Sequence, residues 1–277
     1  MPFPEFDPVI FKIGFFTLRW YALAYIAGLW IGWWYVRSLM AQTALWTPGK
    51  PPAGREQIDD LLLWVTLGVI VGGRLGYVVF YNLPHYLSNP GEIMAVWQGG
   101  MSFHGGFLGV VIAVWLFSRR HQLAVISLGD SVATAAPFGL FFGRLANFIN
   151  SELWGRQTDH PIGVIFPNGG PLPRHPSQLY EAALEGLLLF LILRLATHRF
   201  HRLRSPGAII GLFLLGYGMA RILVEQFRQP DAHIGFLAGG TTLGAWLSYP
   251  MVLVGMVLLV PGLRRRIGLT DNQRLGA

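Results

Sequence analysis

The stretch GRLANFINSELWG, Gly143–Gly155, is the feature around which the rest of this 277-residue chain is arranged. It places Arg144, Asn147 and Glu152 at the end of an apolar run that begins at Ala135. An arginine in an apolar, glycine-rich segment is costly in a bilayer, so it needs an ionic partner or a functional role. Residues three apart share a face of a helix, which puts Arg144 and Asn147 on one side. Two interpretations follow: a polar network that only joins helices, or a binding site.

The composition indicates a membrane protein. Hydrophobic residues make up 53% of the chain and charged residues 13%, whereas soluble domains contain about 25% charged residues. The net charge of +7 would suggest a nucleic-acid partner in a soluble protein. Here the basic residues lie between apolar runs, which favours a role in membrane orientation, and no nucleic-acid partner is expected. The absence of cysteine excludes disulfides, thiolate metal sites and a cysteine nucleophile.

The apolar runs predict an all-α, polytopic integral membrane protein with about seven transmembrane helices, because a helix needs roughly 20 apolar residues to cross a bilayer. We expect a single transmembrane domain over residues 1–277. Ser177 follows a proline and is expected to be the N-cap of the fifth helix. The predicted spans are Trp20–Val36, Leu61–Tyr81, Ser102–Phe117, Ile126–Ile149, Gln178–Ala196, Gly207–Phe227 and Thr241–Leu259.

Basic residues predict the orientation of these spans. Seven spans alternate sides, so the loops fall into two groups. Twelve basic residues fall on one side: Arg37, Lys50, Arg55, Arg119, Arg120, Arg199, Arg202, Arg204, Arg264, Arg265, Arg266 and Arg274. Five fall on the other: Lys12, Arg19, Arg156, Arg174 and Arg228. The positive-inside rule then predicts a cytoplasmic C-terminus, an external N-terminus, and periplasmic loops near residues 82–100, 150–176 and 228–240.

Glycine spacings predict where helices approach one another. The G-x-x-x-G pattern lets helix backbones come close, and we interpret its occurrences as packing without a functional site. They are Gly72/Gly76, Gly105/Gly109, Gly139/Gly143 and Gly207/Gly211.

Three intramembrane arginines, Arg74, Arg144 and Arg221, are the strongest candidates for chemistry. The guanidinium group offers a rigid fork of donors that matches phosphate, and the abundant phosphate of a membrane is a lipid head group. Glu225 lies one turn from Arg221 and is expected to orient it, and Glu152 is expected to do the same for Arg144. The alternative is that the arginines serve only to pair with glutamates, for which the chain offers Glu152, Glu181, Glu185 and Glu225.

Two further residues are candidates because of their neighbours. His104, in the sequence FHGG, is either a structural hydrogen-bonding group or a base, and the glycines after it leave room for a substrate. Tyr217 shares a helix face with Arg221. The sequence contains no H-E-x-x-H zinc motif, no G-x-S-x-G elbow and no P-loop. Neither a metal nor a cofactor is expected.

Seven sequence blocks, in order along nearly the whole chain, resemble the prolipoprotein diacylglyceryl transferase family. The family signature G-R-x-[GA]-N-F-x-N-x-E-x-x-G matches residues 143–155 at every fixed position. The other blocks are FPEFDPVIF near the start, RWYALAY at 19–25, GGRLGYVVFYN, GGMSFHGG, RHPSQLYE and GYGMARILVEQFRQPDA. A thirteen-residue signature with six further blocks is a specific pattern.

The resemblance implies a multi-pass enzyme of the bacterial inner membrane with its active site toward the periplasm. Such an enzyme moves the diacylglyceryl group of phosphatidylglycerol to the lipobox cysteine thiol of a prolipoprotein signal peptide. It forms a thioether and releases glycerol phosphate, in the first step of lipoprotein maturation. A lipid or anion transporter and a structural membrane subunit are the alternatives. A transporter should show internal repeats, and we find none.

The resemblance also implies which residues form the site. Arg144 and Arg221 would hold the lipid phosphate, and His104 and Tyr217 would be polar groups at the reacting end. Positions expected to bind substrate are Tyr21, Arg74, Asn147, Glu152, Gly155, Glu225 and Arg228.

Overall fold

The computed structural model describes residues 1–261 except positions 5, 8, 14, 15, 48, 97, 98, 231–234, 236, 238 and 239. The predicted cytoplasmic tail and part of the predicted loop 228–240 lie outside the described residues. The described chain is mostly helical, as predicted. The all-α expectation missed a short antiparallel hairpin of β1 (Val9–Ile13) and β2 (Phe16–Arg19). Strands this short give too few residues for an alternating pattern to stand out in the sequence.

Each predicted span coincides with a helix or a run of helices. The helices are α1 (Trp20–Met40), α2 (Arg55–Tyr81), α3 (Leu83–Ser88), α4 (Phe103–Arg120), α5 (Val125–Ile149), α6 (Ser177–Glu181), a π-helical segment (Ala182–Leu188), α7 (Leu189–His198), α8 (Ala208–Val224) and α9 (Leu243–Leu259). Short 3₁₀ turns lie at Thr43–Leu45, Pro90–Met94 and Arg202–Arg204. By length and composition α2 and α5 can cross a membrane, and α8 and α9 are shorter apolar helices. The number and direction of the crossings stay predictions.

The described residues divide into two compact units: unit 1 contains Met1–Tyr35 and the residues from Asp130 onward, and unit 2 contains Val36–Gly129. In unit 2, α2 packs against α4. A Cβ atom added to Gly68 would lie 2.6 Å from the Gly109 carbonyl oxygen, and one added to Gly76 would lie 2.7 Å from Gly105 Cα. The packing predicted from the glycines of these two helices is therefore confirmed.

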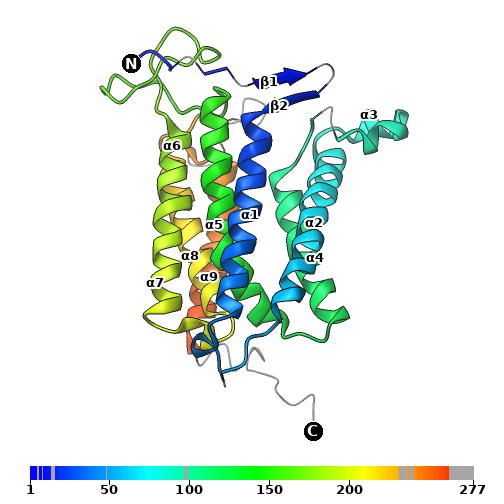
Figure 1. Ribbon diagram of the computed structural model, residues 1–277. Helices are drawn as coiled ribbons and strands as arrows, with labels where there is room; N and C mark the ends of the chain where they lie inside the picture. Colours follow the sequence, from blue (N-terminus) through cyan, green and yellow to red (C-terminus); the bar gives the residue numbers. More distant parts are fainter. Residues whose placement is uncertain are drawn as a thin grey trace. The chain divides into compact units, whose positions relative to one another are not determined.

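In unit 1, the helices α1, α5, α6–α7, α8 and α9 run alongside one another, and the β1–β2 hairpin leads into α1 (Figure 1). Gly211 is a contact with α9, since an added Cβ would lie 2.9 Å from Leu258 Cβ. Gly207 serves a different purpose: its φ of 82° forms the turn before α8. Gly139 is a close approach of α5 to α1, since a Cβ added to Gly28 would lie 3.0 Å from Gly139 Cα. The packing interpretation of Gly143 is wrong, because a Cβ added there would meet nothing within 4 Å.

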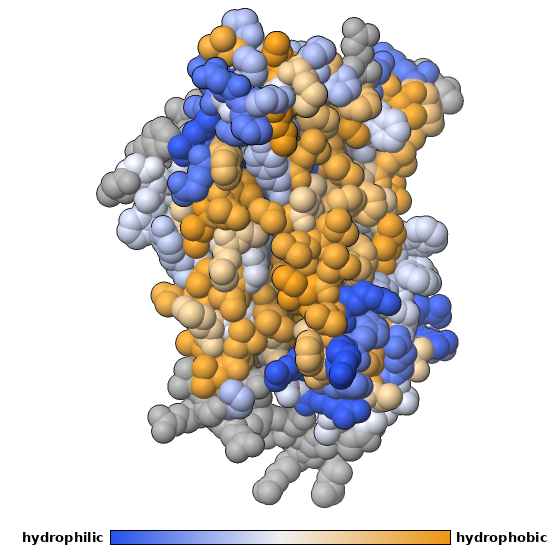
Figure 2. All heavy atoms as spheres, turned by 90° about the vertical axis from the view of Figure 1, so that its left-hand side faces the viewer, coloured by the Kyte–Doolittle hydropathy of each residue, from blue (hydrophilic) through white to orange (hydrophobic). Residues whose placement is uncertain are grey.

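The surface of unit 1 carries many large apolar side chains. Figure 2, which views the molecule from the side of α7, shows hydrophobic residues over the middle of this face and hydrophilic ones toward both ends. On α7 and the π-helical segment the exposed residues include Leu187, Leu188, Leu191, Ile192 and Leu195. Backbone groups in lipid must be satisfied internally, so continuous helices with apolar outer faces suit a bilayer.

Candidate active site

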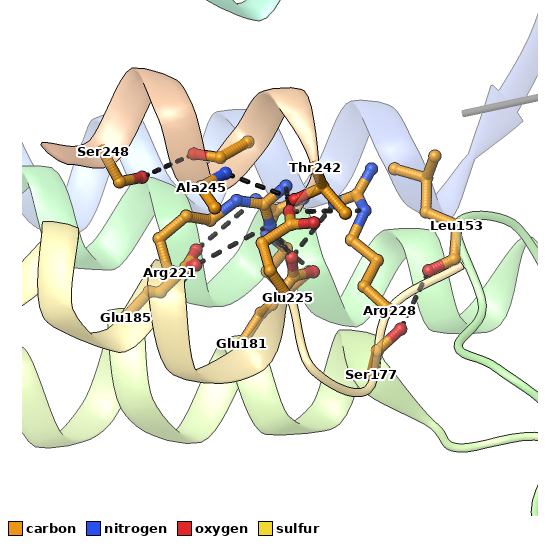
Figure 3. A network of polar contacts seen from close by, with 12 residues as sticks. Leu153, Ser177, Glu181, Glu185, Arg221, Glu225, Arg228, Thr242, Ala245 and Ser248 are labelled. Carbon is orange, nitrogen blue, oxygen red and sulfur yellow. Dashed lines mark hydrogen bonds and ion pairs between the residues drawn. The ribbon is translucent and has the colours of Figure 1, made fainter. Parts of the chain in front are cut away.

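A buried cluster of six charged side chains lies inside unit 1, and Figure 3 labels all of them except Arg144. We call it the arginine–glutamate cluster; its members are Arg144, Arg221, Arg228, Glu181, Glu185 and Glu225. The arginine side chains are 11–14% exposed and the glutamates 0–4%. They come from α5, from the run α6 to α7, and from the end of α8 and the residues after it. Segments far apart in the sequence therefore converge on one polar site in an apolar bundle.

Arg144, from α5, contacts two glutamates. Its Nε lies 3.3 Å from Glu181 Oε2 and its Nη2 lies 3.4 Å from Glu185 Oε2. The predicted pairing of Arg144 with Glu152 is wrong: Glu152 Oε1 instead accepts a hydrogen bond of 2.8 Å from Asn147 Nδ2. The chain reverses just after α5, with a φ of 54° at Ser151, and the Glu152 amide donates to Asn147 O at 3.0 Å. This reversal turns Glu152 back toward Asn147.

Arg221, from α8, is held by three carboxylates. Its Nη2 lies 2.5 Å from Glu225 Oε1, which confirms that Glu225 orients it. Its Nη1 contacts Glu181 and lies 3.9 Å from Glu185 Oε1. Gly244 of α9 leaves room for this arrangement, because a Cβ there would lie 2.8 Å from the Glu225 carboxyl carbon.

Arg228 completes the arginine–glutamate cluster beyond the end of α8. Its Nη1 lies 3.1 Å from Glu181 Oε1, and its Nε lies 4.0 Å from Glu225 Oε1. Glu181 thus contacts three guanidinium groups, the positive surroundings that a fully buried carboxylate requires.

The helix that carries Glu181 and Glu185 is widened at this point. The segment Ala182–Leu188 is π-helical, and π-bulges inside helices occur frequently at functional sites. A π-helix has more residues per turn than the 3.6 of an α-helix, so residues four apart stand more nearly above one another. The widened turn therefore presents both carboxylates to Arg144.

Polar groups border the cluster on α1, α5 and α8. Asn147 Nδ2 lies 3.3 Å from the Tyr21 hydroxyl oxygen, to which it donates. The rings of Tyr21 and Tyr25 lie 5.2 Å apart. Tyr217 is buried one turn before Arg221 and stacks on Phe213. Unit 1 therefore brings together eight of the predicted site residues: Tyr21, Arg144, Asn147, Glu152, Tyr217, Arg221, Glu225 and Arg228.

The loop Asn150–Pro176 closes over the end of α8. The Gly155 amide donates to His175 O at 2.8 Å, and an added Cβ at Gly155 would lie 2.5 Å from Phe227 O. Arg156 donates from Nε to Arg228 O at 2.9 Å and from Nη2 to Glu225 O at 3.1 Å. Gly155 is thus a position where no side chain fits.

The predicted N-cap role of Ser177 is wrong. Pro176 is the N-cap residue of α6, and no side chain caps this helix. The Ser177 hydroxyl instead donates to Leu153 O at 3.1 Å, and Gln178 Nε2 donates to Glu152 O at 2.6 Å. These two side chains fasten the loop to the start of α6.

Two predicted site residues, Arg74 and His104, lie in unit 2. The buried Arg74 guanidinium donates to the backbone carbonyls of Glu92, Ile93 and Gly99 at 2.7, 2.8 and 2.5 Å. It therefore holds the loop that follows α3. His104 is exposed in the first turn of α4. Their predicted roles in substrate binding and catalysis stay predictions.

Sequence reasoning considered Glu181 and Glu185 only as possible partners and did not include them in the site. Their spacing of four in an apolar helix was the available signal, since two carboxylates inside a membrane span mark a functional position. Arg156 was missed as well, because its partners are backbone carbonyls more than 60 residues away in sequence. Among the described residues, no group of three or more His, Asp or Glu side chains is placed to hold a metal ion.

Apolar helices around a buried arginine–glutamate cluster, closed by a folded loop, define a helical membrane protein with a buried ionic site. The model of the family described as "Prolipoprotein diacylglyceryl transferase" matches residues 8–261. The chain therefore belongs to the prolipoprotein diacylglyceryl transferase family, whose members are membrane enzymes.

Proteins named phosphatidylglycerol–prolipoprotein diacylglyceryl transferase resemble the chain over most of its length. The one from Rhodospirillum rubrum is 58% identical over 268 residues, covering 96% of each chain. The one from Nitrobacter winogradskyi is 54% identical over 273 residues, covering 98% of this chain and 93% of its own. The one from Rhizobium meliloti is 52% identical over 257 residues, covering 92% of each.

Proposed function

We propose that this protein transfers the diacylglyceryl group of phosphatidylglycerol to the cysteine thiol of a prolipoprotein lipobox. The names of its relatives support this activity. The observation that carries it is the convergence of Arg144 and Arg221, from two different helices, on the same pair of buried glutamates. Two guanidinium groups held this close are suited to bind one phosphodiester.

In the proposed reaction the thiol sulfur attacks the glycerol carbon that bears the phosphate ester. A carbon–sulfur bond forms, the carbon–oxygen bond breaks, glycerol phosphate leaves with the bonding electrons, and the thiol proton is released. Arg144 and Arg221 stabilise the negative charge that develops on the leaving phosphate. The ion pairs with Glu181 and Glu225 hold Arg221 in place before the lipid binds.

We assign roles to the remaining predicted residues from the family resemblance and from their surroundings in the structure. His104 and Tyr217 are proposed polar groups at the reacting end. Proposed substrate-binding positions are Tyr21, Arg74, Asn147, Glu152, Gly155, Glu225 and Arg228. Of these, Arg74 and Gly155 act by shaping loops, since one binds backbone carbonyls and the other leaves no space for a side chain.

We place the protein in the bacterial inner membrane as a single multi-pass domain, with the arginine–glutamate cluster toward the periplasm. The predicted charge distribution supports this orientation. The cluster lies at the same end of unit 1 as the loop Asn150–Pro176, which belongs to the less basic side of the predicted topology.

The test is transfer of label from phosphatidylglycerol, radiolabelled in its acyl chains, to a synthetic lipobox peptide by the purified protein in detergent. We expect label on the cysteine peptide and none on a matched serine peptide. Phosphatidylethanolamine should be a poor donor, because its ammonium group approaches the same guanidinium groups. Lipid binding without any transfer would favour a transporter or a structural subunit.

A further inference from the structure

The arginine–glutamate cluster contains three guanidinium groups and three carboxylates, so it is neutral when all six are ionised. A lipid phosphodiester brings one negative charge into this site. Inside a protein of low dielectric constant an uncompensated charge is costly. The charge of the bound phosphate must therefore be compensated, and the uptake of one proton by one of the glutamates would make the site neutral again.

Glu185 is the carboxylate with the weakest ionic contacts. Its shortest ion pairs are 3.4 Å to Arg144 and 3.9 Å to Arg221, whereas Glu181 contacts three guanidinium groups and Glu225 lies 2.5 Å from Arg221. Its side chain is fully buried. Within the described part of the chain, Glu185 Oε1 accepts no hydrogen bond.

The charged and titratable groups around Glu185 come from each neighbouring helix. Arg144 faces it from α5, Arg221 and Tyr217 face it from α8, and Glu181 precedes it on its own helix. Both arginines that hold Glu185 are those proposed to bind the phosphate. The lipid phosphate and ionised Glu185 therefore compete for the same two guanidinium groups.

We propose that Glu185 takes up one proton when the lipid phosphate enters the cluster, and thereby releases Arg144 and Arg221 to the phosphate. This inference rests on the proposed function, because it assumes phosphatidylglycerol as the ligand. Glu185 is a positioning residue in this scheme: ionised, it keeps the two guanidinium groups together in the empty site, and neutral, it lets them bind the lipid.

The test is calorimetric titration of the purified protein with short-chain phosphatidylglycerol in two buffers of different ionisation enthalpy. We expect the wild type to take up about one proton per lipid bound near neutral pH. The apparent Kd should then rise about tenfold per pH unit, by proton linkage. Glu185→Gln, which is permanently neutral, should bind the lipid with no proton uptake and with a Kd independent of pH. Asp159→Asn, at an exposed loop position, should behave as the wild type.

Lipid binding by the wild type without proton uptake would overturn the inference while leaving the proposed function intact. Uptake of a full proton by Glu185→Gln would overturn the assignment to this residue. Absence of any lipid binding would contradict the proposed function itself. Should Glu185→Gln not fold, infrared difference spectra of the wild type decide: a protonated carboxyl stretch must appear on adding the lipid, and its absence contradicts the inference.

Discussion

Gly143 and Gly155, the first and last residues of the stretch that dominates this sequence, have opposite surroundings. An added Cβ meets nothing within 4 Å at Gly143, whereas at Gly155 it would overlap the Phe227 carbonyl and the His175 side chain. Gly143 lies in the interior of α5, next to Arg144. The glycine of the loop is thus required by packing, whereas at the glycine of the helix there is open space where a side chain would lie.

We predict that Gly155→Ala lowers the stability of unit 1 by about 1–3 kcal/mol, the usual cost of overpacking. Gly143→Ala should keep or slightly raise stability, because alanine favours a helix by about 0.5–1 kcal/mol over glycine. Thermal unfolding in detergent measures both, with Gly91→Ala as the control at an unobstructed position of the 3₁₀ turn Pro90–Met94. Equal stability of Gly155→Ala and the wild type would contradict the loop geometry.

The residues of the site could be predicted from sequence to the extent that their signals are local. Arg144 and Arg221 stood out as arginines in apolar runs, and the pair Arg221–Glu225 followed from its helical spacing. The partners of Arg144 did not follow, because Glu185 is 41 residues away and reaches it only through the packing of two helices. Sequence proximity favoured Glu152, which the chain reversal turns toward Asn147.

Among the elements, the N-terminus of α8 is capped by a side chain from another helix. The fully buried Asp130 of α5 accepts from the Gly207 amide at 2.7 Å and from the Ile210 amide at 2.8 Å. The first amides of a helix have no partner within it, and a carboxylate there also interacts favourably with the helix dipole. Asp130 therefore holds α5 and α8 together at the end opposite to the arginine–glutamate cluster.

We predict that Asp130→Ala destabilises the protein by at least about 1.5–3 kcal/mol, the contribution of a hydrogen bond to a charged group. The melting temperature in detergent should fall by several degrees, and Asp130→Asn, which keeps one acceptor, should lose less. Asp159→Asn serves as the matched control at an exposed carboxylate. An unchanged melting temperature of Asp130→Ala would show that α8 does not need this cap.

We expect the stability of the folded loop Asn150–Pro176 to depend on pH through His175. Burial lowers the pKa of this imidazole, and the nearby His160 lowers it further. The unfolded loop then binds a proton more readily than the folded one, so stability rises with pH. The stabilisation of the loop by neutral His175 is complete above the ordinary histidine pKa of about 6.5. It is lost as pH falls through the lower pKa that His175 has in the folded loop.

Hydrogen exchange of the loop amides, corrected for intrinsic rates, tests this dependence. We predict faster exchange at about pH 5.5 than at about pH 7.5. At the lower pH, His175 is protonated more readily in the unfolded loop, where its pKa is near the ordinary value of about 6.5, and this favours opening of the loop. His175→Gln should remove the difference, and His198→Gln, at the end of α7, should keep it. A wild type whose loop protection does not change with pH would refute the assignment.

Among the secondary-structure elements, the positions of the helices could be predicted from the sequence better than their ends and connections. Long apolar runs located α1, α2, α4, α5, α8 and α9 because lipid exposure imposes a strong compositional signal. Ser177 is not the predicted N-cap because its hydroxyl donates a hydrogen bond to the Leu153 carbonyl, which joins the loop to the helix. The β1–β2 hairpin and the π-helical segment have no comparable pattern in the sequence.

For the whole molecule, orientation in the membrane is the first prediction. The distribution of basic residues, twelve against five, predicts a cytoplasmic C-terminus. A C-terminal alkaline phosphatase fusion should therefore be inactive in cells, and a C-terminal green fluorescent protein fusion should fluoresce. The reverse pair of results would invert the topology and place the arginine–glutamate cluster on the cytoplasmic side.

In the mechanism proposed for this protein, two guanidinium forks bind one lipid phosphate during diacylglyceryl transfer. The most direct measurement is the initial rate of transfer from phosphatidylglycerol to a lipobox peptide by Arg144→Lys, with folding checked by gel filtration in detergent. Lysine keeps the charge and loses the planar fork. We predict a loss of about 10²–10³-fold, the effect of removing one donor from a developing anion. Arg202→Lys, at an exposed position in the 3₁₀ turn between α7 and α8, should keep the wild-type rate. A folded Arg144→Lys protein with the full rate would show that charge alone suffices and would contradict the bidentate binding of the phosphate.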